Sequence, residues 1–243
     1  KLVDITLRKM KTAFALEYNK SIMIEFQQNH TFLQSINQSI KKNDIFQTRN
    51  FESIYQFYVY RNAMYYLTRV VRPEIVVETG VLHGLTSAWI LQALHENGNG
   101  RLISIDLPRR DWKSEFGDKE YGPLGNGELE ELANESPGWI VPEYLRDNWE
   151  LIIGSSEREL PKLMERNICP DIFIHDSDHS YETMKFECEQ ITSKCSNPYI
   201  VIDNFDVNNY AFQLLSSSNS SSVFIDNVDP QENFAPSTVI IKQ

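Results

Sequence analysis

The sequence has few cysteines, and their spacing excludes most sites that are built from cysteine. Only three are present, Cys169, Cys188 and Cys195, without the paired spacing of a zinc site or a disulfide framework. Cys188 and Cys195 are close enough in sequence to share one face of a helix as small buried apolar groups. We therefore expect reduced cysteines and a cytoplasmic protein.

Long apolar runs and an excess of positive charge are also missing. No apolar run is long enough to span a membrane, and no secretory signal is recognisable. The formal net charge of −11 disfavours nucleic acid as the main partner. The 243 residues, 41% of them hydrophobic, suffice for one α/β domain with additions. These counts predict a globular protein with neither a membrane nor a nucleic acid as its partner.

Strand and helix patterns alternate from about residue 74 onward, which favours a parallel sheet with crossover helices. The expected helices cover residues 85–96, 157–166 and 180–194. The expected strands cover residues 74–79, 101–106, 149–153, 171–175 and 199–203, with a final antiparallel pair at 222–226 and 237–241. The pattern thus predicts an α/β fold with seven strands.

Two segments stand outside this alternation. Residues 1–70 have helical apolar spacing and form an N-terminal extension to a domain at 71–243. The tyrosine-rich part, 51–71, is expected either to pack as a helix on the sheet edge, or to cap a pocket or form a homodimer face. Residues 107–148 are rich in glycine, proline and aromatic residues. We interpret them as a lid-like insertion that contacts the substrate.

Residues 73–87 predict a ligand-binding turn between a strand and a helix. Gly80 and Gly84 allow a sharp turn and a close approach of the backbone to a ligand. Thr86 lies where the N-terminal amides of a helix can receive an anion. Glu78 precedes the first glycine, and its carboxylate suits an amine or a cation better than a pyrophosphate.

Two common phosphate-binding patterns do not fit this turn. The glycines have the spacing G-x-x-x-G, whereas a dinucleotide fingerprint needs G-x-G-x-x-G. A P-loop needs a lysine after its glycines, and none is present. A plain strand-to-helix turn remains the alternative.

Polar residues also follow the next two expected strands. Asp106 ends the strand 101–106, where ligands of open α/β sheets bind, and its carboxylate can accept both hydroxyls of a ribose. A helix cap or a surface acid is the alternative. Ser155 and Ser156 follow the strand 149–153, where small residues let an adenine ring lie against the backbone. They also suit a helix N-cap.

The densest cluster of ionisable groups falls at 175–179, where four occur within five positions. Asp176 follows one expected strand, and Asp203 and Asn204 follow its neighbour. Two carboxylates and an amide oxygen would make an all-oxygen site for Mg²⁺. His179 is placed to act as a general base, because its ordinary pKa is about 6.5. The alternative is a solvated loop whose acids cap the next helix.

From about residue 74 to its end, the chain resembles class I S-adenosylmethionine-dependent methyltransferases. Four segments carry the resemblance in order, at 77–86, 101–106, 152–163, and 173–181 with 202–204. The last is similar to a group with an Asp-x-Asp-His-x-Tyr motif, and the set is similar to catechol O-methyltransferase and related cation-dependent enzymes. The resemblance implies a Rossmann-like seven-stranded sheet, mostly parallel with its last strand antiparallel, and S-adenosylmethionine as cofactor.

The resemblance also implies roles for individual residues. Asp176, Asp203 and Asn204 fall on metal-ligand positions, and His179 stands where catechol O-methyltransferase has a catalytic lysine. The cofactor-binding positions are Glu78, Gly80, Gly84 and Thr86 for the methionine part, Asp106 for the ribose, and Ser155 and Ser156 for the adenine.

Together these patterns predict an O-methyltransferase for a small-molecule hydroxyl, in which Mg²⁺ assists, His179 takes the proton and Asp176 supports the reaction. Two alternatives remain: a metal-independent methyltransferase that uses His179 as base, and a non-catalytic cofactor-binding scaffold. A hydrolase is disfavoured because no G-x-S-x-G motif is present.

Overall fold

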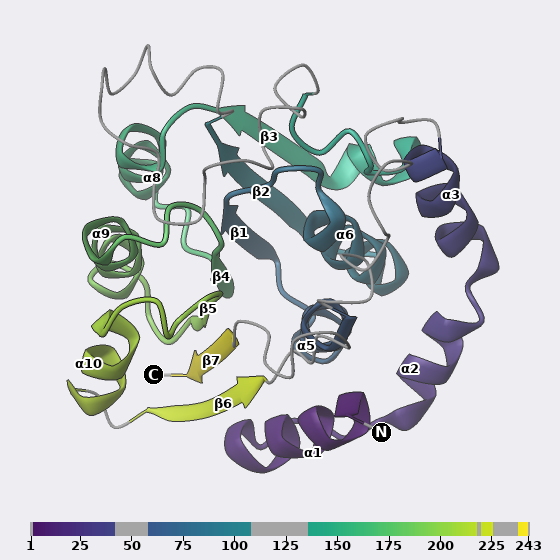
Figure 1. Ribbon diagram of the computed structural model, residues 1–243, viewed down its shortest axis with the longest axis horizontal. Coiled ribbons are helices and arrows are strands. Elements are labelled where there is room, and N and C mark those ends of the chain that lie inside the picture. Colours follow the sequence, from purple (N-terminus) through teal and green to yellow (C-terminus); the bar gives the residue numbers. More distant parts are fainter. Residues whose placement is uncertain (1, 42–57, 108–135, 218–219, 226–237, 243) are drawn as a thin grey trace.

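A single seven-stranded sheet forms the centre of the computed structural model, which describes residues 2–41, 58–107, 136–217, 220–225 and 238–242 (Figure 1). The strand order is β3-β2-β1-β4-β5-β7-β6. The five strands β1 to β5 pair in parallel, whereas β7 pairs antiparallel with both β5 and β6. The strands are β1 (Ile75–Thr79), β2 (Arg101–Asp106), β3 (Trp149–Ile153), β4 (Ile172–His175), β5 (Tyr199–Ile202), β6 (Ser221–Ile225) and β7 (Thr238–Lys242). The predicted fold class is confirmed.

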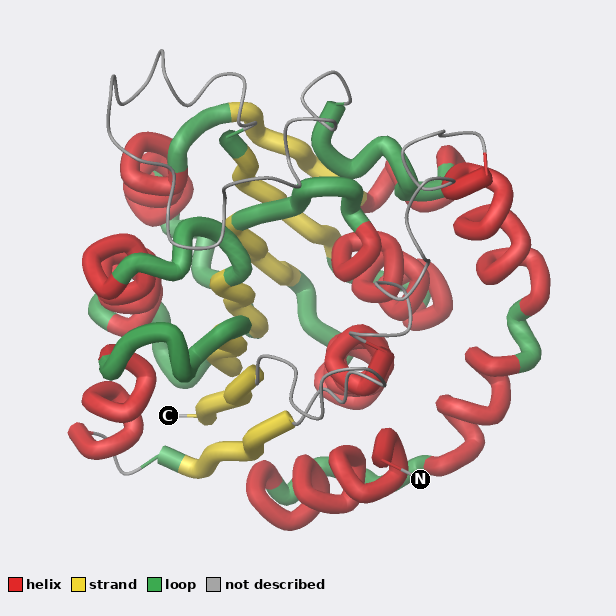
Figure 2. The backbone as a smooth tube through the Cα atoms, viewed as in Figure 1, coloured by secondary structure: helices red, strands yellow, loops and turns green. Residues whose placement is uncertain are grey.

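Helices cover both faces of the sheet, as Figure 2 shows with helices in red. Successive strand residues point to opposite faces, so Val76 and Val77 belong to two different buried clusters. The cluster around Val77 is covered by α8 (Ser156–Glu165), α9 (Tyr181–Thr192) and α10 (Tyr210–Ser217). The cluster around Val76 is covered by α5 (Tyr58–Val71) and α6 (Leu85–Asn97). A short 3₁₀ helix, η2 (Glu143–Asn148), leads into β3.

Three N-terminal helices form an outer arc around α5 and α6 (Figure 1). They are α1 (Leu2–Phe14), α2 (Lys20–Gln27) and α3 (His30–Lys41). Aromatic rings attach this arc, because Phe26 lies 4.0 Å from the Tyr65 ring and Phe32 lies 5.0 Å from the Trp89 ring, centroid to centroid. Helices expected in residues 1–70 are therefore present, while 42–57 lie outside the described residues.

Three tyrosines of α5 pack inside the chain. Tyr60, Tyr65 and Tyr66 are at most 2% exposed, which agrees with a helix that packs on the sheet. A homodimer stays a prediction. Most of the predicted insertion, residues 108–135, lies outside the described residues, and its role as a lid stays a prediction too.

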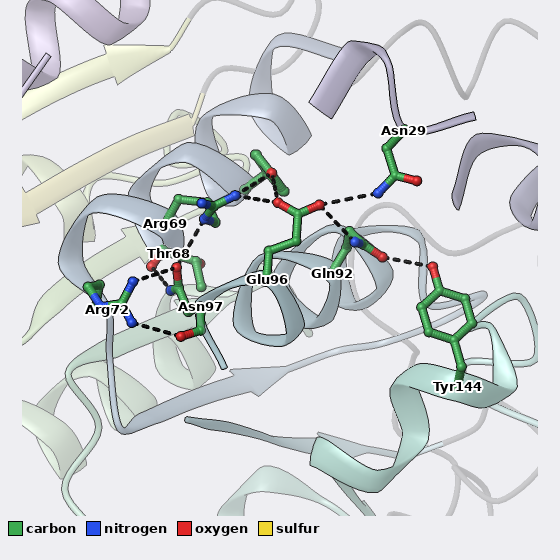
Figure 3. Close-up of polar contacts among 9 residues, drawn as sticks. Asn29, Thr68, Arg69, Arg72, Gln92, Glu96, Asn97 and Tyr144 are labelled. Carbon is green, nitrogen blue, oxygen red and sulfur yellow. Dashed lines mark hydrogen bonds and ion pairs between the residues drawn. The ribbon is translucent and has the colours of Figure 1, made fainter. Parts of the chain in front are cut away.

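Glu96, near the end of α6, is the centre of a polar network that joins several helices (Figure 3). It accepts hydrogen bonds from Arg69 and Tyr65 of α5, from Gln92 at 2.8 Å and from Asn29 at 3.2 Å. Asn29 lies between α2 and α3. Glu96 thus connects the N-terminal arc to both helices beneath it.

Cys169 and Cys195 form a disulfide, with their Cα atoms 5.3 Å apart. The expectation of three reduced cysteines is therefore wrong. Cys188 is free and buried on α9, but Cys195 lies beyond the end of this helix, so the two do not share one helix face. The bond joins the segment before β4 to the segment after α9, and only the fold brings these two segments together.

The helices of the described residues are all too short or too polar to cross a membrane. Disulfides persist mainly in oxidising compartments. The cytoplasmic location stays a prediction.

Candidate functional site

The carboxyl ends of neighbouring strands bring the predicted site residues to one edge of the sheet. Thr79 of β1 is the register partner of His175 of β4, which in turn pairs with Ile202 of β5. The ladder continues one residue further, because the Asp176 amide donates to Thr79 O at 2.9 Å and the Asp203 amide donates to His175 O at 3.0 Å. The turn after β1 and the loops after β4 and β5 are thus adjacent.

The glycines of the turn after β1 are required by close packing within the chain itself. Gly80 has φ +83°, and a Cβ there would overlap the carbonyl group of Asp176. Gly84 has φ +85°, and its Cβ would lie 2.6 Å from Gly138 Cα. Thr86 is half-buried in the first turn of α6. The backbone of the turn therefore contacts the loop that carries Asp176.

Glu78 is a buried acid that points to the face covered by α6. Its Oε1 accepts hydrogen bonds from the hydroxyls of Ser104, at 2.6 Å, and Ser87. Burial raises the pKa of Glu78 to about 7, although the two serines oppose this, and the nearby charge of Asp106 raises the pKa further. A positively charged group of a ligand would stabilise the ionised carboxylate and so offset the effect of burial.

Asp106 holds the turn after β1 in place. Its Oδ2 accepts hydrogen bonds from the backbone amides of Leu82, at 2.9 Å, and Val81, at 3.2 Å. Burial still raises the pKa of Asp106 to about 6. A second acid with a raised pKa thus lies close to Glu78.

Ser155 and Ser156 begin α8, as their sequence position predicted. Ser155 is the N-cap residue and is 3% exposed. The Ser156 side chain is hydrogen-bonded to the carboxylate of Glu187, on α9. Glu187 did not stand out in the sequence.

Asp176, His179 and Asp203 converge beyond β4 and β5. One potential ligand atom of each lies within 4.8 Å of the others. Burial raises the pKa of Asp176 well above its ordinary value, and the charge of Asp203 adds to this. Burial also raises the pKa of Asp203, despite a 2.6 Å hydrogen bond from the Thr238 hydroxyl. Two carboxyl groups this close, with Asp203 buried and Asp176 half-buried, are stabilised by a shared proton or a shared cation.

Asn204 and His179 complete the cluster. Their side chains meet at 3.1 Å between Asn204 Nδ2 and His179 Nε2. Burial and the neighbouring His175 lower the pKa of His179 to about 4, so the ring is neutral near pH 7. Among the described residues, Asn204 Oδ1 is a buried oxygen without a hydrogen-bond partner. This oxygen is suited to a further ligand.

Arg61 of α5 is a site residue that the sequence analysis missed. It is 7% exposed, and burial lowers its pKa to about 10. The positive charge of Arg61 counteracts part of the rise in the pKa of Asp176. Burial, together with the same charge, lowers the pKa of His83 to about 4. In the sequence, the only indication of this role was that the polar pair Arg61-Asn62 stands within a helix of mainly aromatic and apolar residues.

Residues 77–205 match the family model described as a methyltransferase domain. This chain belongs to the methyltransferase-domain family. The match extends from β1 to the loop after β5, so it contains every predicted site residue. Family membership is confirmed, whereas the match does not test the narrower motif group or the role of any single residue.

Solved structures show the same fold. An O-methyltransferase from Bacillus cereus in complex with SAH is 13% identical, with a TM-score of 0.55 over 88% of this chain and 91% of that one. An O-methyltransferase from Streptomyces achromogenes involved in tomaymycin synthesis, in complex with SAM, is 12% identical, with a TM-score of 0.55 over 98% and 95%. A methyltransferase from Geobacter sulfurreducens is 15% identical, with a TM-score of 0.51 over 93% and 98%. A search of curated proteins finds no match.

Proposed function

We propose that this methyltransferase uses S-adenosylmethionine to methylate a hydroxyl group of a small molecule, with a divalent cation such as Mg²⁺ at Asp176, Asp203 and Asn204. The observation that carries the proposal is the convergence of Asp176, His179 and Asp203 beside the glycine turn. This convergence supports the proposal of a cation and a base beside the predicted cofactor turn.

The turn after β1 fits a positively charged cofactor. Glu78 is buried and Asp106 is half-buried, and the loss of water around their carboxyl groups raises their pKa values to about 7 and about 6. Positive charge next to them would offset this loss. The ammonium and sulfonium groups of S-adenosylmethionine would supply it, and the cofactor provides an already activated methyl group. The related structures bound to SAH and SAM support this choice. Thr86, Ser155 and Ser156 remain proposed cofactor contacts.

The loops after β4 and β5 fit a hard divalent cation. The carboxylates of Asp176 and Asp203 and the unpartnered Asn204 Oδ1 offer oxygen, which Mg²⁺ prefers. A zinc site would use more histidine or cysteine. A cation at this position would lower the pKa of a substrate hydroxyl.

The properties of His179 favour cation assistance over the metal-independent alternative. A pKa of about 4 leaves the ring neutral and able to accept a proton, but makes it a weak base. Such a base suffices only for a hydroxyl that has been made more acidic. The structure would then mainly align the attacking oxygen with the methyl group.

Calorimetry with S-adenosylhomocysteine (SAH) and Mn²⁺ tests the proposal before any acceptor is known. The wild type is expected to bind both ligands. Asp176→Asn, which removes one charge at nearly constant size, should abolish Mn²⁺ binding and leave SAH binding largely intact. Asp106→Ala should weaken SAH binding. The control, Asp206→Asn, changes an exposed acid near the same loop and should alter neither.

Other outcomes would point to the alternatives. Turnover that survives EDTA would favour a metal-independent enzyme with His179 as base. SAH binding without transfer to any of a broad panel of acceptors would favour a non-catalytic scaffold. No SAH binding at all would contradict the proposed function.

A further inference from the structure

Glu187, on α9, is a fully buried acid that accepts hydrogen bonds from several segments of the site. Its Oε2 lies 2.5 Å from the Thr79 hydroxyl and 2.7 Å from His175 Nδ1. Its Oε1 accepts a 2.7 Å hydrogen bond from the Ser177 hydroxyl, and the Ser156 side chain is also hydrogen-bonded to the carboxylate. An ionised carboxylate is an acceptor only, so it can accept all four of these contacts.

The ionised form of Glu187 is stabilised by these contacts. Burial alone raises the pKa of a carboxyl group, but His175 and the surrounding donors outweigh this and lower the pKa of Glu187. The nearby protein thus provides the donors that water would otherwise provide. Loss of the acid would deprive two buried donors, Thr79 and His175, of this acceptor.

The residues that donate to Glu187 flank the predicted ligand-binding positions. Thr79 immediately precedes Gly80 in the cofactor turn, and His175 and Ser177 lie on either side of Asp176 in the loop after β4. One carboxylate therefore holds both the cofactor turn and the proposed metal loop. These segments also touch directly, since a Cβ on Gly80 would overlap Asp176.

We infer that Glu187 is a positioning residue that fixes the cofactor turn and the metal loop relative to each other. This inference rests on the proposed function, because it assigns those two segments to a cofactor and a cation. Glu187 acts through Thr79 on the first and through His175 and Ser177 on the second.

Variants of the acid and of its separate donors test the inference by binding, without an acceptor. Calorimetry of the full chain measures SAH and Mn²⁺ independently. Glu187→Gln keeps the size of the side chain but replaces one acceptor oxygen with a donor, and both affinities should fall about tenfold, the effect of one strong hydrogen bond. Thr79→Val should weaken mainly SAH binding, and Ser177→Ala mainly Mn²⁺ binding.

The selectivity of the two donor variants separates positioning from general stability. A residue that only stabilised the fold would weaken both ligands together, in proportion to the loss in unfolding free energy. Circular dichroism and urea unfolding establish that each variant is folded at the temperature of the titration. Glu189→Gln is the matched control, because Glu189 lies on the same helix and is exposed, 4.0 Å from Lys185. It should change neither affinity.

The outcomes distinguish this inference from the proposed function. If the wild type bound both ligands and Glu187→Gln bound them equally well, only the inference would be overturned. The same would follow if Thr79→Val and Ser177→Ala each weakened both ligands to the same extent. If the wild type bound neither SAH nor Mn²⁺, the proposed function would fail and the inference with it.

Discussion

Glu78 and Glu187 are both buried acids near the carboxyl edge of the sheet, but their pKa values shift in opposite directions. Glu78 has two serine donors, and burial still raises its pKa to about 7. Glu187 has an imidazole in addition to hydroxyl donors, and its pKa falls. The His175 imidazole and the larger number of donors around Glu187 account for the difference, together with the charge of Asp106 near Glu78.

The raised pKa of Glu78 makes the unfolding free energy of the ligand-free protein depend on pH. The folded pKa of about 7 exceeds the ordinary value of 4.5, so the contribution of Glu78 to stability is fully present below pH 4.5 and is lost as pH rises through 7. Glu78→Gln does not titrate. Relative to the wild type, it should therefore gain about 2–3 kcal/mol in unfolding free energy between pH 4.5 and pH 8.

Urea unfolding of both proteins at the two pH values measures this gain. Titrating groups that do not interact with Glu78 cancel in the comparison, whereas Asp106, whose charge raises the pKa of Glu78, adds a smaller change of its own. A difference between variant and wild type that stays constant with pH would contradict the raised pKa of Glu78.

Gly80 should tolerate no side chain, because its left-handed backbone and its contact with Asp176 both oppose a Cβ. We expect Gly80→Ala to lose roughly 3 kcal/mol or more of unfolding free energy, together with SAH binding. Gly98→Ala is the matched control. Gly98 also has a positive φ, of +68°, but a Cβ there would meet nothing within 4 Å, so only the backbone cost of about 1 kcal/mol applies. Equal losses for both variants would contradict the packing argument.

At the scale of elements, the Cys169–Cys195 disulfide closes the unit formed by β4 and α9, with a sequence separation of 26. This unit carries Asp176, His179 and Glu187. Reduction of the wild type should lower the unfolding free energy by about 3 kcal/mol, because the unfolded chain regains the freedom that the closed loop removes.

Guanidinium unfolding with and without dithiothreitol measures the contribution of the disulfide. Cys169→Ser should have the stability of the reduced wild type in both conditions, which makes it the control for other effects of the reductant. Equal stability of the oxidised and reduced wild type would contradict the prediction.

The sequence predicted most strands and helices of the sheet within one or two residues, because local periodicity encodes them. The strands 101–106 and 149–153 were predicted with the bounds of β2 and β3. The meeting of Asp176 and Asp203 was also predictable, since acids after neighbouring parallel strands share one edge.

Contacts between distant segments were not predictable in this way. Glu187 lies on α9 near Glu182 and Glu189, and the sequence does not show which of these acids faces the core. The pairing of Cys169 with Cys195 and the approach of Arg61 to the site depend on how whole helices pack. The patterns in single segments carry no such information.

At the scale of the whole molecule, the N-terminal arc completes the core. Leu7, Phe26 and Phe32 belong to the same buried cluster as Val76 of β1 and Trp89 of α6. The contacts of Phe26 and Phe32 with α5 and α6, together with the bond from Asn29 to Glu96, attach the arc over a long surface.

A chain that lacks residues 1–41 is therefore expected to lose cooperative unfolding, because Tyr65 and Trp89 would become exposed. Thermal unfolding by circular dichroism and the binding of a hydrophobic dye measure this, with the full chain as control. A truncated chain that unfolds as sharply as the full one would indicate that the arc is an independent unit.

The hydrogen bonds around Glu187 also constrain how this protein can change during evolution. A lineage can replace Thr79 or Ser177 and lose one donor at a time, at moderate cost. Replacement of the acid while its donors remain deprives two buried donors, Thr79 and His175, of this acceptor at once. Among homologues, substitutions at Glu187 should therefore occur mainly where the donor positions have already diverged. Because one acid accepts from several donors, replacement of the donors is expected to precede replacement of the acid.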